Sequence, residues 1–533
     1  MNSSTGDRHS TGRAKKIGVI FFFTLLVGAI AYYLAAPDVQ TQQTTARSVL
    51  LEVPDTREQA LILLANLYDE DPAVLQTSQD GAWLASTSQR ASRLLDDLRS
   101  FILKPRPVES EVFLILCLVL LVPQGTFTLF WMLYAWNDPN KAAQGESPRD
   151  YLAPYYAFTA LVPARHEEKV IKDTIYAINA IDYPSHLKEI LVPVRDEDDE
   201  GTITKVKEAI AELGDANIRL ITFKDGPKNK PNGLNHGLRV ATKDVVCIFD
   251  AEDEPHPAIY DIVNTVMLRD DADVVQSGVQ LMNIDSTWFS ALNCLEYFFW
   301  FKSGLRFFTD LLHVTPLGGN TVFFKRTWLN RIGGWDDRLL TEDADIGIRM
   351  VLQGAKLRIV YDAQHVTQEE TPATVEQFIK QRTRWSQGFF EILFKFGWWR
   401  LAQLRQRLGA MFILMNPFFQ ASMIFYLPLG LYILLTQQVS VALAVLSYIP
   451  LAMLLIQLLV NLAGIKAFAA AYNKSLPRLF ALKMVAGYYP YQLMLAVASF
   501  RAVYRYVKGH HSWEKTTHSN LHRTSVARMR ESV

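Results

Sequence analysis

Four acidic residues follow an apolar run that predicts a buried strand at residues 245–249. They are Asp250, Glu252, Asp253 and Glu254, in the segment FDAEDEPHP. Carboxylates this close together repel one another unless a cation lies between them, and their oxygens suit Mg²⁺ or Mn²⁺. A metal held at this point can neutralise the diphosphate of a leaving group. Taken alone, the segment is equally compatible with an acidic turn exposed to solvent.

Acidic residues also follow two other predicted strands. The segment VRDEDDEGT carries the carboxylates of residues 196–199, and ALVPARHEE places Glu167 beyond Pro163. Ligands of parallel α/β sheets bind at the carboxyl ends of the strands. The three strand ends together therefore predict one polar, acidic rim that forms a binding site.

The elements that position this rim alternate regularly between strand and helix patterns. In order, they are AFTALVPA, KVIKDTIYAINAI, EILVPV, TKVKEAIAEL and IRLITF. This β-α-β-α-β rhythm predicts an α/β, Rossmann-like domain, in which helices cover both faces of a parallel sheet. We place this domain at residues 150–390.

Several long stretches of the chain carry no charged side chain. Two of them are residues 17–36 and 112–136, and others are 408–465 and 484–500. A bilayer core needs about 20 apolar residues per helix, and helices buried in soluble proteins seldom stay uncharged on every face. We therefore predict two N-terminal transmembrane helices, 17–36 and 112–136, and further ones within 408–505.

The charges flanking these stretches predict the orientation of the chain. Four basic residues against one acid before the first span place residues 1–16 in the cytosol. Two crossings leave the helically patterned segment 37–109 outside and return residues 150–390 to the cytosol. The tail 506–533 is also predicted to be cytosolic, which requires four C-terminal spans, or two and an interfacial helix. An interfacial helix is predicted at 391–407. We thus expect a multi-pass integral protein of the plasma (inner) membrane.

Three further motifs follow the acidic segment in order along the chain. They are GGNTVFFKR (318–326), the triplet TED within GGWDDRLLTEDADIGIRM (333–350), and QRTRW (381–385). A D-x-D-like triplet followed by Thr-Glu-Asp and Gln-x-x-Arg-Trp resembles the family 2 glycosyltransferases, which have a GT-A fold. The membrane-embedded branch with Gln-x-x-Arg-Trp is similar to cellulose synthase, mannan/glucomannan synthase-like proteins, and hyaluronan or chitin synthases. The resemblance covers about residues 155–400 and extends to the flanking membrane spans.

The resemblance assigns roles to the residues that match its motifs. The resemblance implies that Asp343 is the general base and that Asp250 and Glu252 bind the metal. It implies that Glu342 and Trp385 bind the acceptor. The residues implied to bind the donor are Glu167, Asp196, Asp198, Lys230, Asn235, Asp250, Gln381 and Arg384. Glu252 departs from the family's D-x-D, which leaves open whether Asp253 helps. The roles agree with an inverting displacement, which needs a carboxylate at the acceptor hydroxyl and cations on the departing diphosphate. A Trp face suits the apolar face of a sugar ring, although a membrane-interface position is the alternative for Trp385.

The function implied by the resemblance is processive synthesis of a β-linked polysaccharide from a UDP- or GDP-hexose, with transport of the product across the membrane. The cofactor would be Mg²⁺ or Mn²⁺, and the partners would be the nucleotide-sugar, a glycan acceptor and membrane lipid. The zero net charge gives no indication of nucleic acid binding. The segment SWEKTTH (512–518) resembles a gating segment that closes over bound nucleotide, with a basic tail near lipid as the alternative. Transfer of a single sugar to a lipid or short glycan is the second hypothesis. A transporter is the third, and the scarcity of intramembrane charges disfavours it.

Overall fold

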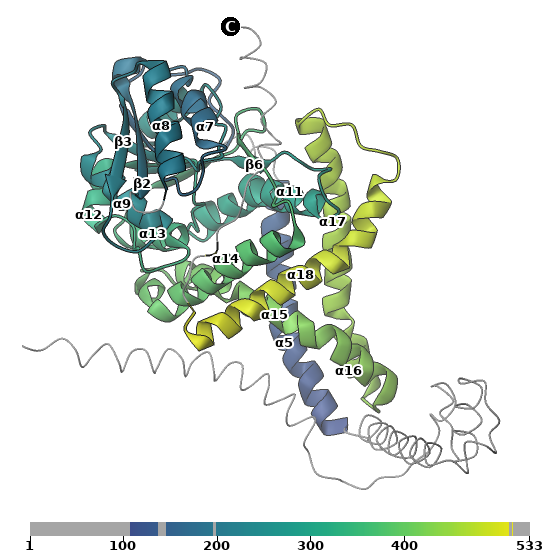
Figure 1. Ribbon diagram of the computed structural model, residues 1–533. Coiled ribbons are helices and arrows are strands. Elements are labelled where there is room, and N and C mark those ends of the chain that lie inside the picture. The colour runs from purple at the N-terminus through teal and green to yellow at the C-terminus, as the bar shows by residue number, and fades with distance from the viewer. Residues whose placement is uncertain (1–106, 137–144, 196–198, 511–513, 515–533) are drawn as a thin grey trace, which may run out of the picture. The chain divides into compact units, whose positions relative to one another are not determined.

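The domain predicted at residues 150–390 is built around a mixed sheet of seven strands (Figure 1). The computed structural model describes residues 107–136, 145–195, 199–510 and 514. The strand order is β3-β2-β1-β4-β7-β5-β8, and β6 pairs with β9 in a separate two-stranded sheet. The strands are β1 (Phe158–Leu161), β2 (Lys188–Arg195), β3 (Ile218–Phe223), β4 (Val245–Ile248), β5 (Val274–Ser277), β6 (Val279–Leu281), β7 (Val322–Lys325), β8 (Leu357–Val360) and β9 (Thr367–Glu369).

The strands that precede the predicted acidic rim run parallel to one another. Strand β1 pairs in parallel with β2 and β4, so that its last residue, Leu161, lies beside Leu191 of β2 and beside Ile248, the last residue of β4. Ala164, beyond β1, forms a further parallel bridge with Val194 near the end of β2. Strand β7 is the exception, because it runs antiparallel to both β4 and β5. The prediction of an α/β sheet is confirmed, and the three predicted strand ends do meet at one edge.

Helices cover both faces of this sheet, as predicted. One core cluster joins alternate sheet residues to apolar side chains of α7, α8 and α10, and a second joins the other face to α9, α12 and α13. These helices are α7 (Ile171–Asn179), α8 (Glu200–Leu213), α9 (Lys230–Val240), α10 (Ile259–Asp270), α12 (Arg326–Ile332) and α13 (Glu342–Leu352). A 3₁₀ turn, η1 (Ser185–Leu187), precedes β2. The alternation of strand residues between the two clusters follows from the period of two in a β-strand.

A second group of helices lies beside the sheet domain and carries the QRTRW motif (Figure 1). Helix α11 (Ser290–Phe299) continues into the π-helical segments η2 (Trp300–Gly304) and η3 (Phe307–Leu311), and α14 (Val375–Lys395) contains the motif. Helix α18 (Phe480–Lys508) packs along α14, where Thr383 Oγ1 donates to the Ala498 carbonyl at 3.2 Å. The chain thus folds α18 back onto the helix that carries the QRTRW motif.

Three helices among the described residues are long and apolar enough to cross a membrane. They are α5 (Pro107–Leu133), α15 (Leu404–Thr436), and the continuous stretch Val441–Ala471 formed by α16 (Val441–Ser447) and α17 (Ile449–Ala471). One precedes the catalytic domain and two follow it. The predicted span 112–136 corresponds to α5, whereas the predicted span 17–36 and nearly all of the segment 37–109 lie outside the described residues.

The described residues fall into two compact units. The first holds the sheet domain together with α11, α14, α17, α18 and the adjoining parts of α5 and α15. The second contains the remainder of α5, the end of α15 and α16, within which Tyr426 Oη donates to the Ser447 carbonyl at 2.5 Å.

The segment predicted as one interfacial helix, 391–407, is divided in the structure. Residues up to Lys395 belong to α14, a 3₁₀ turn, η4 (Gly397–Arg400), follows, and α15 begins at Leu404. Phe396 has a positive φ of 57°, which ends the α-helical path there.

Candidate active site

A cavity of about 520 Å³ lies within the first unit at the carboxyl ends of the parallel strands, and we call it the central cavity. Nine of the twelve predicted site residues line it. They are Glu167, Lys230, Asp250, Glu252, Glu342, Asp343, Gln381, Arg384 and Trp385. Ligand sites commonly have volumes of about 300–1,000 Å³, so the cavity has the size of a ligand site.

Lys230 is paired with the first acidic residue of the rim. Its ammonium group forms an ion pair with Asp250 and donates to the Gly319 carbonyl at 2.8 Å. Burial alone would lower the pKa of Lys230, but the charges of Asp250, Glu342 and Asp343 raise it above its ordinary value. Lys230 therefore stays protonated and supplies a fixed positive charge to this end of the cavity.

The glycine pair of GGNTVFFKR allows the backbone to approach these side chains. A Cβ atom on Gly319 would lie 3.2 Å from Asp343 Oδ2 and 3.4 Å from Lys230 Nζ. A larger residue at position 319 would thus occupy the space beside both groups.

Asp253, in contrast, turns away from the cavity and organises the acidic loop. It is fully buried, accepts from the Asp250 backbone N–H at 2.8 Å, and accepts from Asn320 Nδ2 at 2.9 Å. Asn320 also donates to Glu369, which does line the cavity. Burial and the charge of Glu369 raise the pKa of Asp253 well above its ordinary value. Asp253 therefore supports the loop from behind, whereas Glu252 lines the cavity.

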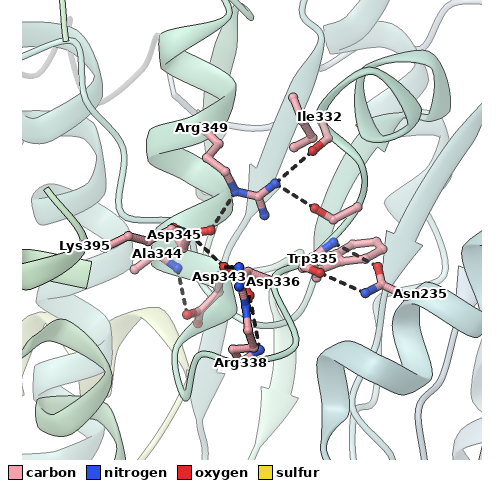
Figure 2. A network of polar contacts seen from close by, with 11 residues as sticks. Asn235, Ile332, Trp335, Asp336, Arg338, Asp343, Ala344, Asp345, Arg349 and Lys395 are labelled. Carbon is pink, nitrogen blue, oxygen red and sulfur yellow. Dashed lines mark hydrogen bonds and ion pairs between the residues drawn. The ribbon is translucent and has the colours of Figure 1, made fainter. Parts of the chain in front are cut away.

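The Thr-Glu-Asp triplet forms the start of α13 and aims two carboxylates at the cavity. Thr341 precedes the helix, and Asp343 Oδ1 accepts from the Ala344 backbone N–H at 2.8 Å (Figure 2). Burial raises the pKa of Asp343, although that hydrogen bond, Lys230 and Arg384 oppose the change. Burial and the neighbouring Asp343 raise the pKa of Glu342 as well. A carboxylate with a raised pKa next to a reacting hydroxyl is suited to act as a general base.

A network of ion pairs behind Asp343 fixes the start of α13 (Figure 2). Lys395, at the end of α14, binds Asp345 at 2.8 Å and Asp336 at 2.9 Å. Arg349 binds Asp345 at 2.6 Å and the Gly334 carbonyl at 2.8 Å. The loop before the triplet, α13 and α14 are thereby held together next to the candidate base.

The structure places Asn235 differently from its predicted role in donor binding. Its Nδ2 donates to the Trp335 carbonyl at 2.8 Å, and its Oδ1 accepts from the Trp335 backbone N–H at 2.9 Å (Figure 2). Asn235 is also not among the described residues that line the central cavity. Because both ends of its amide bind the loop, Asn235 supports the backbone of GGWDDRLL in this structure, and its role in donor binding stays a prediction.

The QRTRW motif lies on α14, where it faces the cavity close to α13. Gly388, one turn beyond the motif, has no space for a side chain, because a Cβ there would lie 2.3 Å from Thr341 Oγ1. This contact brings Arg384 near the carboxylates. Burial lowers the pKa of Arg384, whereas Glu342, Asp250 and Asp343 oppose that change. Arginine remains charged throughout, so Arg384 supplies a second fixed positive charge to the carboxylates of the cavity.

The sheet domain can be identified by comparison with known proteins. Residues 154–388 match the family model described as "Glycosyltransferase like family 2". They form a family 2 glycosyltransferase domain. With the mixed sheet described above, the domain has the predicted GT-A fold.

Curated relatives of this glycosyltransferase domain match it over part of their length. "Probable glycosyltransferase YdaM" of Bacillus subtilis (strain 168) is 29% identical over 241 residues, 45% of this chain and 56% of the relative. "Poly-beta-1,6-N-acetyl-D-glucosamine synthase" of Staphylococcus aureus (strain COL) is 26% identical over 242 residues, 44% of this chain and 55% of the relative. The chain thus spans little more than half the length of these relatives.

Among solved structures, the mannosyltransferase PcManGT from Pyrobaculum calidifontis, in complex with GDP-Man and Mn²⁺, resembles this chain with a TM-score of 0.47. The two sequences are 18% identical, and the match covers 75% of this chain and 99% of that chain.

The acidic end of the glycosyltransferase site suits a divalent cation. Asp250 and Glu252 are the cavity residues that would hold it, and no group of three or more His, Cys, Asp or Glu among the described residues is arranged as a complete ligand set. Mg²⁺ at phosphate sites commonly uses one or two carboxylates, with phosphate oxygens and water as the other ligands. Burial and the charges of Glu252 and Asp250 raise the pKa of Glu369 to about 8. This excess of negative charge would favour a cation at the site.

Two groups of residues in the glycosyltransferase site were not predicted. Basic side chains of Arg165, Arg195 and Lys228 line its strand-end side, and Glu296, Tyr297 and Arg382 line it beside Trp385. Arg382 could have been noticed, because it lies inside QRTRW. Arg165 and Arg195 lie inside the strand-end segments ALVPARHEE and VRDEDDEGT, where only the acidic residues were singled out. Lys228, Glu296 and Tyr297 belong to none of the motifs, so only the fold brings these three to the site.

Two other predicted features lie mostly outside the described residues. Asp196 and Asp198 are not described, whereas Asp199 caps α8 by accepting from the Thr202 backbone N–H at 3.3 Å. Of the predicted gating segment 512–518, the structure describes Glu514, which binds Arg501 at 2.7 Å. The donor-binding and gating assignments therefore remain predictions.

Proposed function

We propose that this protein is an inverting hexosyltransferase that extends a β-linked polysaccharide from a UDP- or GDP-hexose and moves the product across the plasma (inner) membrane. The observation that carries the proposal is the continuity of the central cavity. The same cavity that contains Asp250 and Asp343 is also lined by side chains of α5, α15, α17 and α18. A growing glycan could therefore pass from the site of transfer to the apolar helices without leaving a protein surface.

The helix end of the cavity has the chemistry that a neutral sugar chain requires. Amide side chains there are Gln124, Asn416, Gln420, Gln457, Asn461 and Gln492, and aromatic ones are Trp131, Phe412, Phe419, Tyr488 and Tyr491. Amides donate and accept hydrogen bonds, and aromatic faces suit the apolar faces of sugar rings. Among the described residues, those that α5, α15, α17 and α18 contribute to the lining carry no charge.

The proposed transfer follows from the placement of three side chains. Asp343 accepts the proton of the acceptor hydroxyl while that oxygen bonds to the anomeric carbon of the donor. The bond from the anomeric carbon to the diphosphate breaks on the opposite side, which inverts the configuration. Lys230 and Arg384 place positive charge beside the departing nucleoside diphosphate. Mg²⁺ or Mn²⁺ bound at Asp250 and Glu252 would supply further charge neutralisation.

In this proposal Trp385, with Glu342, binds the acceptor sugar. Trp385 is partly exposed within the cavity and lies near Tyr297, with ring centroids 6.4 Å apart. Together with Gln381 and Arg384, Trp385 supports a place in the membrane-embedded branch that is similar to cellulose synthase. The polysaccharide product of the S. aureus relative, which this chain resembles over part of its length, also supports polymer synthesis.

Transfer of one sugar to a lipid or short glycan is the competing function, since the same catalytic residues would serve it. The test is to incubate sealed membrane vesicles, catalytic face outward, with each radiolabelled nucleotide-sugar and to size the product. We expect long, enzyme-digestible chains inside the vesicles. Accumulation of singly glycosylated lipid on the outer face would overturn processive synthesis and favour the competing function.

A further inference from the structure

Arg382, inside the QRTRW motif, is buried in an ion-pair network beside the central cavity. It is 8% exposed, and its two terminal nitrogens each donate to one oxygen of Glu296 at 2.9 Å. The same guanidinium donates to Asn293 Oδ1 at 2.5 Å. Glu296 and Asn293 both belong to α11, so Arg382 joins α14 to α11 through a two-pronged contact that only arginine can make.

The guanidinium of Arg382 also lies over the ring of Trp385. The distance from its central carbon to the indole centroid is 4.4 Å, and the distance to the Phe378 centroid is 5.0 Å. Residues 378, 382 and 385 are spaced by four and three positions, which places them on one face of α14. A cation over an aromatic ring at this distance attracts it, and more strongly in a desolvated setting. The guanidinium thus restrains the orientation of the indole.

Glu296 extends the network to a third helix. Besides the two bonds from Arg382, its carboxylate accepts a hydrogen bond from Tyr491 Oη of α18. Glu296, Arg382 and Tyr491 all line the central cavity together with Trp385. A buried ion pair adds little stability compared with apolar residues of the same size. Its placement next to the proposed acceptor platform therefore points to a role in the reaction.

We propose that Arg382, held by Glu296, is a positioning residue that fixes the ring of Trp385 for the acceptor sugar, and that Tyr491 ties this platform to α18. The inference rests on the proposed function in that Trp385 is taken to bind the acceptor. The acceptor sugar would meet an indole whose orientation is set before it arrives, so that its hydroxyl reaches Asp343 in one geometry.

The test is a double-mutant cycle between Arg382→Lys and Trp385→Ala in the full-length, membrane-embedded protein. Lysine keeps the charge but cannot bind both oxygens of Glu296. The acceptor probe is a set of short oligosaccharides prepared by partial hydrolysis of the polymer that the protein makes. We expect Arg382→Lys to raise the KM for the acceptor by about 10–100-fold, as for other misplaced binding groups, with the KM for the donor unchanged. In the Trp385→Ala background the same change should have little further effect.

A matched control is Arg219→Lys, which alters another arginine paired with a buried carboxylate. Arg219 binds Glu189 at 3.0 Å at the start of β3, away from the carboxyl ends of the strands. It should leave both KM values unchanged. Tyr491→Phe, which removes one hydroxyl, should raise the KM for the acceptor by a smaller factor than Arg382→Lys.

The outcomes separate this inference from the proposed function. If Arg382→Lys impairs acceptor use equally with and without Trp385, or raises the KM for the donor instead, the positioning role is wrong while the proposed function stands. If Trp385→Ala alone leaves acceptor use unchanged, the acceptor role of Trp385 fails, and the inference fails with it.

Discussion

The two ends of the central cavity differ in charge. The strand end is lined by Asp250, Glu252, Glu369 and Lys230, whereas the end lined by the apolar helices carries amides and aromatic rings. In the proposed function, bond making at the strand end requires charges fixed in place, because a diphosphate leaves and a proton moves. Passage at the helix end requires weak, repeated contacts, and a fixed charge there would cost free energy in a low-dielectric setting. The contrast agrees with the proposed function, in which one protein both makes and conducts a neutral polymer.

Removing the candidate base at the strand end should have the largest effect on the rate of transfer. Asp343→Asn should lower kcat by about 10²–10⁴-fold, because general-base catalysis is lost. Binding of the nucleotide-sugar, measured by calorimetry, should change little. Asp285→Asn, at an exposed position, is the control. Turnover of Asp343→Asn within a few-fold of the unaltered protein would exclude Asp343 as the base. Another residue of the cavity would then have to accept the proton.

Removing the metal or its ligand should have the second-largest effect on the rate of transfer. Excess EDTA should abolish transfer, and restoring Mg²⁺ or Mn²⁺ should recover it. Asp250→Ala should lower kcat/KM by about 10²-fold, since charge neutralisation by a metal is worth several kcal/mol. It should also weaken binding of the nucleotide-sugar. Full activity in EDTA would show that the acidic end works through Lys230 and Arg384 alone.

Much of this strand end could be predicted from the sequence. Asp250 and Asp343 could be predicted because each stands in a short motif whose position, after a strand or at a helix start, fixes where the side chain points. The contact between Asn235 and Trp335 could not be predicted, because an amide fits a ligand or a backbone turn equally well, and only the fold shows that Trp335 lies beside it. The antiparallel direction of β7 was also hidden, because an apolar run has no direction.

The helix end was less predictable. Apolar composition indicated the spans, but α11 and its partner α18 are far apart in sequence, and nothing in either segment indicates that Glu296 meets Tyr491. The return of α18 along α14 depends on small and polar contacts, such as the 3.2 Å contact between Ser386 and Ser499. Such contacts are specified by three-dimensional packing and leave no periodic signal.

A change of pH should reveal the electrostatic character of the strand end. Asp343 must be ionised to act as a base, and burial raises its pKa, so kcat/KM should rise with pH through that raised pKa. The positive charge of Lys230 lowers the pKa of Asp343, against the effect of burial. Lys230→Met should therefore move the acid limb of the profile to higher pH by about one unit, in addition to weakening donor binding. A limb that moves to lower pH, or does not move, would contradict the assignment.

The smallest expected effect is at the helix end, and it tests most directly whether the two ends of the cavity have separate roles. Asn461→Leu replaces a cavity-lining amide of α17 with an apolar side chain of similar size. A single hydrogen bond is worth about 0.5–1.5 kcal/mol, so the mean product length should fall by about two- to tenfold. The initial rate of transfer to a short primer should stay the same, because Asp343 and Asp250 are untouched. Leu459→Met, at an exposed position of the same helix, is the control. Equal losses in primer transfer and in product length would show that the helix end belongs to the catalytic site, and that the two ends do not divide the work as their charges indicate.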